Sequence, residues 1–197
     1  MSSWNSRLAA LLARENRVIV GITGSPGSGK SALARQIASS VDDAVHVPMD
    51  GFHLADAELQ RLGRLDRKGA IDTFDAYGYL ALLQRIRRGA EAVYAPAFDR
   101  DIEQPVAGSI RVEPTARLIV TEGNYLLDDD EPWPRVRRAL DEVWFVACEP
   151  DERRRRLIAR HVEFGKSPER AQVWVRDIDE PNAERIERGR RKADLVI

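Results

Sequence analysis

An apolar, β-branched run that leads into a glycine-rich loop constrains this chain more than any other feature. Residues 18–23 read Val-Ile-Val-Gly-Ile-Thr, and residues 24–31 read Gly-Ser-Pro-Gly-Ser-Gly-Lys-Ser, which fits the pattern G-x-x-x-x-G-K-[ST]. Residues 32–38 come directly after this loop and read as a helix. Glycines let backbone N–H groups close around phosphate oxygens without Cβ clashes, and a helix N-terminus attracts the same anion. The pattern therefore predicts a strand, a phosphate-binding loop and a helix.

The residues of this loop have separate predicted roles in binding a nucleoside triphosphate. We expect Lys30 to reach the β- and γ-phosphates and the Ser31 hydroxyl to hold Mg²⁺. The alternative is an ordinary glycine-rich turn, which the strand–loop–helix context disfavours. The predicted nucleotide-binding residues are Gly24, Ser25, Pro26, Gly27, Ser28, Gly29, Lys30, Ser31 and Ala32.

Composition limits the classes of partner. The 197 residues suffice for one domain with a substantial core, and 43% of them are hydrophobic. The net charge of −1 gives no general attraction for nucleic acid or an anionic membrane. The single cysteine, Cys148, excludes an intrachain disulfide and suits a reducing compartment. With no targeting segment and no apolar run of membrane-spanning length, we expect a cytoplasmic protein that binds neither nucleic acid nor membrane.

Strand-like and helix-like stretches alternate along the chain, which predicts an α/β fold with a parallel sheet flanked by helices on both faces. Residues 92–112 contain short extended pieces and read as a hairpin-type excursion outside the core sheet. The expected core strands are residues 17–23, 44–49, 118–121, 143–147 and 194–197, and the expected helices include residues 5–15, 29–39, 54–62, 76–88 and 151–164.

Two carboxylates come after predicted strands, where ligands of such a sheet bind. Asp50 stands directly after the second strand, and we expect it to accept the proton of an attacking hydroxyl. The alternative for Asp50 is a turn or helix N-cap aspartate. Glu122 ends the third strand and is predicted to act on Mg²⁺, directly or through water. The alternative for Glu122 is a buried acid paired with a lysine.

A run of arginines predicts a lid over the phosphates. Arg153, Arg156 and Arg160 are spaced i, i+3 and i+7, so they share one face of a helix. We expect residues 151–166 to form the lid, with Arg156 and Arg160 neutralising charge in the transition state. The alternative is a solvated charged face.

Residues 51–112 are expected to cover the acceptor of the phosphoryl group. This segment carries many side chains that form hydrogen bonds, and individually they are weak signals because loop charges are commonly just solvated. Tyr125 comes after the third strand, and the sequence does not separate a pocket residue from a packing residue at that position. The candidate acceptor-binding residues are His53, Arg67, Asp75, Asp99, Arg100 and Tyr125.

Along nearly its whole length the chain resembles the phosphoribulokinase, uridine kinase and pantothenate kinase group of P-loop kinases, and most of all the bacterial uridine-kinase-like branch that is sometimes labelled fructokinase. The resemblance implies ATP as donor, Asp50 as catalytic base, Glu122 near Mg²⁺ and a lid that contains Arg156 and Arg160. It rests on the phosphate loop and on residues 50–53, 67–69, 73–75, 96–100, 122–127, 156–161 and 193–197.

The sequence thus predicts a single P-loop kinase domain that moves the γ-phosphoryl group of ATP to a hydroxyl of a small molecule, with Mg²⁺. A sugar-type acceptor is slightly preferred, because the acceptor segment is polar, over a nucleoside or pantothenate. Aromatic residues of the same segment are the counter-evidence, since a stacked pair would fit a pyrimidine. A nucleotide-hydrolysing switch is the alternative of another class, and it lacks an N-K-x-D motif. A homo-oligomer is compatible with the sequence.

Overall fold

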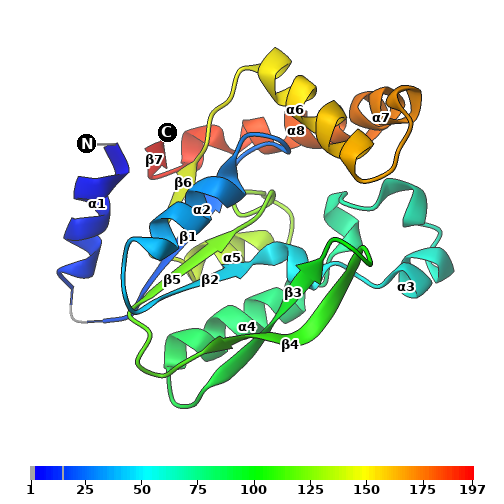
Figure 1. Cartoon of the computed structure of the whole chain (residues 1–197). Helices are drawn as coiled ribbons and strands as arrows, with labels where there is room; N and C mark the ends of the chain where they lie inside the picture. Colours follow the sequence, from blue (N-terminus) through cyan, green and yellow to red (C-terminus); the bar gives the residue numbers. More distant parts are fainter. Residues whose placement is uncertain (1–2, 15) are drawn as a thin grey trace.

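The computed structural model describes residues 3–14 and 16–197, and its centre is a parallel β-sheet (Figure 1). Strands pair in the order β2-β5-β1-β6-β7, and every pairing in this sheet is parallel. This arrangement confirms the predicted α/β class. The strands are β1 (Val18–Thr23), β2 (Ala44–Pro48), β5 (Leu118–Glu122), β6 (Glu142–Phe145) and β7 (Leu195–Val196).

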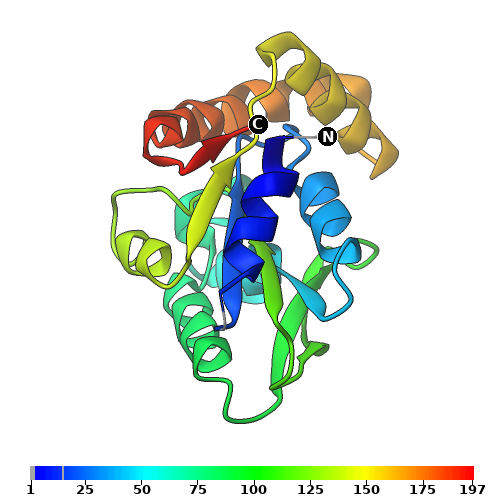
Figure 2. The same cartoon turned by 90° about the vertical axis from the view of Figure 1, so that its left-hand side faces the viewer.

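Helices cover both faces of the sheet and its carboxyl edge. On one face lie α1 (Ser3–Leu12) and α2 (Lys30–Ser39); on the other lie α4 (Ala76–Arg88) and α5 (Trp133–Arg138) (Figure 2). The segments α6 (Pro150–Glu163), α7 (Pro168–Trp174), the π-helix η4 (Val175–Asp179) and α8 (Glu180–Arg188) lie above the carboxyl ends of the strands (Figures 1 and 2). The remaining short helices are α3 (Asp56–Arg61), η1 (Met49–Phe52), η2 (Leu65–Arg67), η3 (Ile71–Thr73) and η5 (Arg190–Lys192).

The central strands are buried throughout and mostly apolar because both of their faces are covered. All six residues of β1 and all five of β5 are buried. Side chains of β1 alternate between two cores, so that Val18 and Val20 pack with α1 and α2 whereas Ile19 packs with α4 and α5. The sheet is therefore a rigid platform for the loops at its carboxyl edge.

An antiparallel hairpin, β3 (Val93–Asp99) and β4 (Gln104–Val112), lies beside the main sheet, as predicted for residues 92–112. The hairpin packs so closely on η1 that a Cβ atom at Gly51 would lie 2.3 Å from the Pro96 carbonyl oxygen. Only glycine fits that approach. The hairpin tip consequently reaches the segment that carries Asp50.

Several element boundaries coincide with local signals. Helix α4 begins after Asp75, whose side chain accepts a hydrogen bond from the Gly78 N–H, and ends at Gly89 in the left-handed conformation. Helix α7 begins at Pro168, with the Ser167 hydroxyl as its cap. The first helix spans Ser3–Leu12 where the sequence predicts 5–15, and residue 15 lies outside the described residues. Within residues 3–14 and 16–197, no helix combines the length and the apolar character that a membrane crossing needs.

Candidate active site

The phosphate loop joins β1 to α2 and closes tightly against its neighbours. Gly27 and Gly29 have φ angles of 80° and 96°, in the left-handed region that glycine tolerates. A Cβ atom at Gly24 would lie 2.6 Å from the Val146 carbonyl oxygen, and one at Gly27 would lie 2.8 Å from Leu157 Cγ. The glycines therefore serve the close packing of the loop against β6 and α6 as well as its curvature.

Lys30, Ser31 and Glu122 come together at the start of α2. The Ser31 hydroxyl donates to Glu122 Oε1 at 2.9 Å. Burial lowers the pKa of the Lys30 ammonium, against the attraction of the Glu122 and Asp50 carboxylates. Burial and the nearby Asp50 carboxylate raise the pKa of Glu122, which is only 3% exposed, and Lys30 offsets part of that effect. This end of the sheet thus concentrates buried charges of both signs.

The oxygen atoms at this point fit a magnesium ion. Glu122 Oε2 is buried and has no hydrogen-bond partner among the described residues, while the Ser31 hydroxyl lies on the other oxygen of the same carboxylate. Mg²⁺ prefers hard oxygen ligands and is usually held by one or two carboxylates together with substrate phosphates and water. The part of the chain that is described contains no cluster of three or more His, Cys, Asp or Glu residues able to hold a metal, and a phosphate-bound Mg²⁺ needs none.

Asp50 lies on η1, across the crevice from Lys30 and Glu122. Its Oδ2 is 3.4 Å from Arg100 Nη2 of the hairpin tip, and its carbonyl oxygen is 2.8 Å from the His53 ring Nδ1. The segment is fixed from two sides, by Gly51 against the hairpin and by Gly123, where a Cβ atom would lie 2.6 Å from Met49 Sδ. The backbone that carries Asp50 is therefore fixed at the edge of the crevice.

A cavity of about 220 Å³ opens in front of these residues. Its walls come from the phosphate loop, η1, the loop before η3, the hairpin tip and the segment from α6 to α8. The lining residues are Pro26, Lys30, Ser31, Asp50, His53, Lys68, Gly69, Phe74, Arg100, Glu103, Asn124, Arg160, His161, Phe164, Lys166, Trp174, Asp179 and Asn182.

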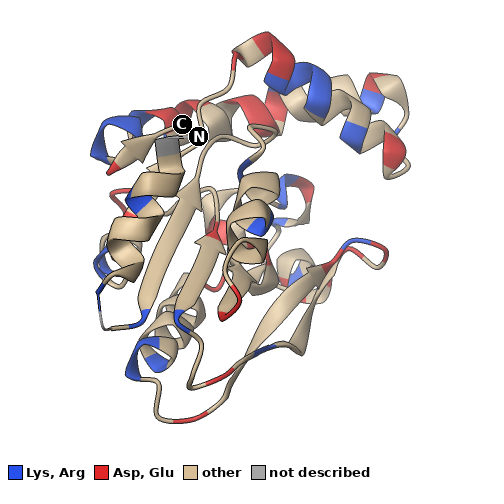
Figure 3. Ribbon diagram, turned by 60° about the vertical axis from the view of Figure 1, so that its left-hand side comes forward, with Lys and Arg blue, Asp and Glu red and all other residues tan. Residues whose placement is uncertain are grey.

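The three arginines of the predicted lid have different surroundings. Basic residues run along α6, interspersed with acidic ones (Figure 3). Arg160 lines the cavity, where burial and the Arg100 guanidinium lower its pKa, and no ion-pair partner is found for it among the described residues. Arg156 pairs with Glu152 at 2.7 Å and lies outside the cavity. It also lies beside the phosphate loop, since its Nη1 would be 3.9 Å from a Cβ atom placed on Gly29.

Arg153 is an anchor of α6. It is 5% exposed and forms an ion pair with Glu180 of α8. One turn later Leu157 is fully buried against Gly27. The first half of α6 is thus packed onto the phosphate loop, and it is the second half that reaches the cavity.

Two of the predicted acceptor-binding residues, His53 and Arg100, line the cavity, and four do not. Arg67 pairs with Asp72 at 2.7 Å, and Asp75 caps α4. The other two are Asp99, which accepts from the Asp101 N–H in the hairpin turn, and Tyr125, which is buried and donates its hydroxyl to the Gly69 carbonyl oxygen at 2.7 Å. Each of the four satisfies a nearby partner and lies outside this cavity, in contrast to His53 and Arg100.

Sequence reasoning missed most of the cavity wall between residues 164 and 182. His161 Nε2 lies 2.8 Å from Asp179 Oδ2, and Lys166 Nζ lies 4.7 Å from the centre of the Trp174 ring. Asp179 ends the π-helix η4, and π-helical turns occur frequently at functional sites. The available signal was an isolated tryptophan in a segment that is otherwise charged.

Comparisons with known proteins agree with this geometry. No family model matches the chain. It is 34% identical over 171 residues to a putative uridine kinase from Schizosaccharomyces pombe. The alignment covers 81% of this chain and 73% of that protein. It is 35% identical over 129 residues to the pantothenate kinase of Bacillus velezensis, covering 60% and 40% of the two chains. The crystal structure of a putative fructose transport system kinase from Silicibacter sp. TM1040 superimposes with a TM-score of 0.87 and 34% identity, over 96% of this chain and 98% of that one.

Proposed function

The chain belongs to the ATP-dependent P-loop kinases of the uridine kinase and pantothenate kinase group, and we propose that it transfers the γ-phosphoryl group of ATP to a hydroxyl of a sugar-type acceptor. The position of Asp50 is the observation that carries this proposal. Its carboxylate lines the cavity together with Lys30 and Arg160, with open space in front of it for an acceptor hydroxyl. A base at that point and cations around it are what phosphoryl transfer requires.

In the proposed reaction, Asp50 accepts the proton of the acceptor hydroxyl as that oxygen attacks the γ-phosphorus. Lys30 neutralises charge on the β- and γ-phosphates, and Arg160 neutralises charge on the transferred group. Ser31 and Glu122 would hold Mg²⁺, which would offset the charge of the phosphates. We assign Arg156 to a form of the protein in which the lid is closed over the phosphates. In that form its guanidinium, which lies beside Gly29 in this structure, contacts the phosphates.

The polar lining of the cavity favours a sugar-type acceptor. Buried polar groups need partners, and a polyol offers a donor and an acceptor at each hydroxyl. Three aromatic side chains, Phe74, Phe164 and Trp174, also line the cavity, and polar or charged side chains outnumber them. Tyr77 and Tyr94 are 59% and 54% exposed and lie outside the cavity, while the ring of His53 packs between Phe74 and Phe98 with centroid distances of 4.0 and 4.8 Å.

A nucleoside or pantothenate remains the second candidate acceptor. Relatives that carry the names uridine kinase and pantothenate kinase favour it, and the Trp174 ring in the cavity wall could stack on a base. An aromatic face in the cavity wall favours a nucleoside, whose base can stack on it, over a sugar, which binds through its hydroxyls.

A comparison of acceptors at a fixed ATP concentration tests the proposal. Phosphate transfer is measured to fructose, uridine and pantothenate, with the Lys30→Ala variant as the background control. The sugar proposal expects the highest kcat/KM for fructose. A large advantage for uridine or pantothenate would replace the acceptor and leave the kinase assignment intact, whereas transfer to none of the three would refute all the named acceptors.

A further inference from the structure

One polar side chain of the cavity wall has no hydrogen-bond partner in the described part of the chain and no role in the proposed reaction. Asn124 lines the cavity, and its Oδ1 atom is buried without a hydrogen bond to any described residue. Its backbone is fixed, because the Thr23 hydroxyl donates to the Asn124 carbonyl oxygen at 3.1 Å. A buried carbonyl oxygen left unpaired carries a desolvation cost, so native proteins rarely leave one without a protein, water or ligand donor.

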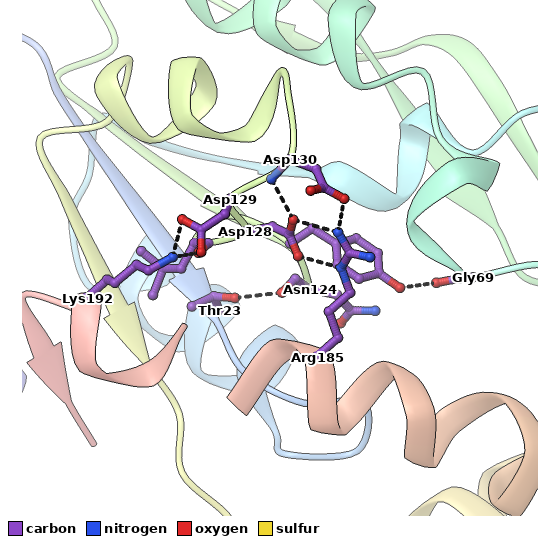
Figure 4. Close-up of polar contacts among 10 residues, drawn as sticks. Thr23, Gly69, Asn124, Asp128, Asp129, Asp130, Arg185 and Lys192 are labelled. Carbon is purple, nitrogen blue, oxygen red and sulfur yellow. Dashed lines mark hydrogen bonds and ion pairs between the residues drawn. The ribbon is translucent and has the colours of Figure 1, made fainter. Parts of the chain in front are cut away.

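The loop that carries Asn124 is held by a clasp that consists of Asp128, Asp130 and Arg185. Arg185 of α8 donates from Nε to Asp128 Oδ2 at 2.6 Å and from Nη2 to Asp128 Oδ1 at 2.8 Å, and it also bonds Asp130 (Figure 4). Burial alone would raise the pKa of Asp128, but the Arg185 fork and the Asp130 N–H hold it below its usual value. The carboxylate therefore stays charged and paired at neutral pH.

The clasp joins three parts of the cavity wall. Asn124 lies four residues before Asp128 in the clasped loop. Tyr125, its neighbour, donates to the Gly69 carbonyl oxygen and so ties the loop before η3 to the same segment (Figure 4). On the other side, Arg185 fixes α8, which carries Asn182 into the cavity. A displacement of the clasp would therefore shift the wall around the acceptor.

We propose that Asn124 determines acceptor specificity by accepting a hydrogen bond from a second hydroxyl of a polyol acceptor, and that Arg185 is the positioning residue that holds it there. The inference rests on the proposed function, since it assigns a contact to the acceptor of that reaction. A hydroxyl can donate to the Asn124 oxygen while its own oxygen accepts from a neighbouring donor in the cavity. Asp50 acts on the hydroxyl that attacks, so the Asn124 contact belongs to a different hydroxyl of the same molecule.

A double-mutant cycle on the full-length protein tests both parts of the inference. The variants are Asn124→Ala, Arg185→Met and their combination, assayed for KM and kcat with ATP and with the best acceptor of the fructose, uridine and pantothenate comparison. Arg61→Met is the matched control, because Arg61 forms an exposed ion pair with Glu58 on α3 and lines no part of the cavity. Thermal unfolding identifies a temperature at which all variants are folded.

The expected result is an acceptor KM raised roughly 10-fold by Asn124→Ala, as for the loss of one buried hydrogen bond, with the ATP KM within about twofold of wild type. Arg185→Met changes the acceptor KM in the same direction, and the double variant resembles Asn124→Ala alone, because Arg185 acts through Asn124. An unchanged acceptor KM in Asn124→Ala overturns the inference even if Arg185→Met fails to fold. Additive effects, or equal rises in the two KM values, overturn the positioning role. If the wild type phosphorylates no acceptor, the proposed function fails instead.

Discussion

Substitution of Gly51 by alanine tests how strictly the Asp50 segment is positioned. A Cβ atom there would lie 2.3 Å from the Pro96 carbonyl oxygen and 2.7 Å from the Pro96 carbonyl carbon. Both are backbone atoms of the hairpin, so no flexible side chain can give way. To reach even 3.0 Å, η1 and β3 must separate by about 0.7 Å. We expect that overpacking to cost ~1–3 kcal/mol of unfolding free energy.

A displacement of that size would shift Asp50, the proposed catalytic base. Misplacement of a catalytic group by about 1 Å can cost ~10²-fold in rate, so Gly51→Ala should lower kcat by roughly 10- to 100-fold. The ATP KM should change little, since Gly24 and Gly27 of the phosphate loop pack against Val146, Arg153 and Leu157, outside the hairpin. The loss of stability corresponds to a fall in Tm of roughly 2–12 °C for a chain of this length.

Steady-state kinetics and thermal unfolding on Gly51→Ala, with Gly108→Ala as control, separate position from stability. Gly108 also lies in the hairpin and has a φ of 70°, but among the described residues no atom beyond its two chain neighbours lies within 4 Å of its Cβ position. Gly108→Ala should therefore lose ~1 kcal/mol of stability from backbone strain alone, with kcat unchanged. A folded Gly51→Ala protein with wild-type kcat would show that the hairpin does not fix Asp50.

Three further predictions concern the charged groups. Asp50→Asn should keep ATP affinity and lose kcat by about 10²–10⁴-fold, and near-normal turnover would place the base elsewhere. Glu122→Gln should raise the Mg²⁺ concentration needed for half-maximal activity, because the amide carries no charge; an unaltered Mg²⁺ titration would favour a structural role for Glu122. In hydrogen exchange, residues 158–166 should gain protection with an ATP analogue, whereas residues 151–157 should be protected in both states. Equal protection of 158–166 with and without the analogue would contradict a lid.

The fold could be predicted because its signals are local and mutually consistent. Residues 18–22 of β1 and 118–120 of β5 are apolar on both faces, and the phosphate-loop motif places the start of α2 directly after the loop that follows β1. Asp75 and Gly89 mark the two ends of α4 within a residue of where the sequence predicts them. Helices α5 and α8 and the π-helix η4 are less visible in the sequence, since half-exposed, charged helices packed on an edge depend on long-range ion pairs such as Arg185–Asp128.

The candidate site was most predictable in the phosphate loop and at the ends of the strands. Asp50 and Glu122 stand at strand ends, and the topology of a parallel sheet brings such residues to one edge. The acceptor side consists instead of loop residues. The sequence does not separate Asp75 and Asp99, which lie outside the cavity, from His53 and Arg100, which line it. The difference arises from short-range hydrogen bonds. Asp75 and Asp99 each accept from a nearby backbone N–H, and this local bond turns the carboxylate away from the cavity.

The contacts of α8 limit which of the helices above the carboxyl ends of the strands can move. Glu187 accepts from the Ser25 hydroxyl of the phosphate loop at 3.0 Å, Glu180 pairs with Arg153 of α6, and Arg185 holds the loop after β5. These partners belong to the phosphate loop, α6 and the loop after β5, so α8 joins three elements around the cavity. We propose that motion admitting the acceptor is confined to the second half of α6 and to α7, which contribute Arg160, Lys166 and Trp174 to the cavity wall. Closure of this short segment would bring the Arg160 guanidinium toward the phosphates and leave Ser31 and Glu122 in place.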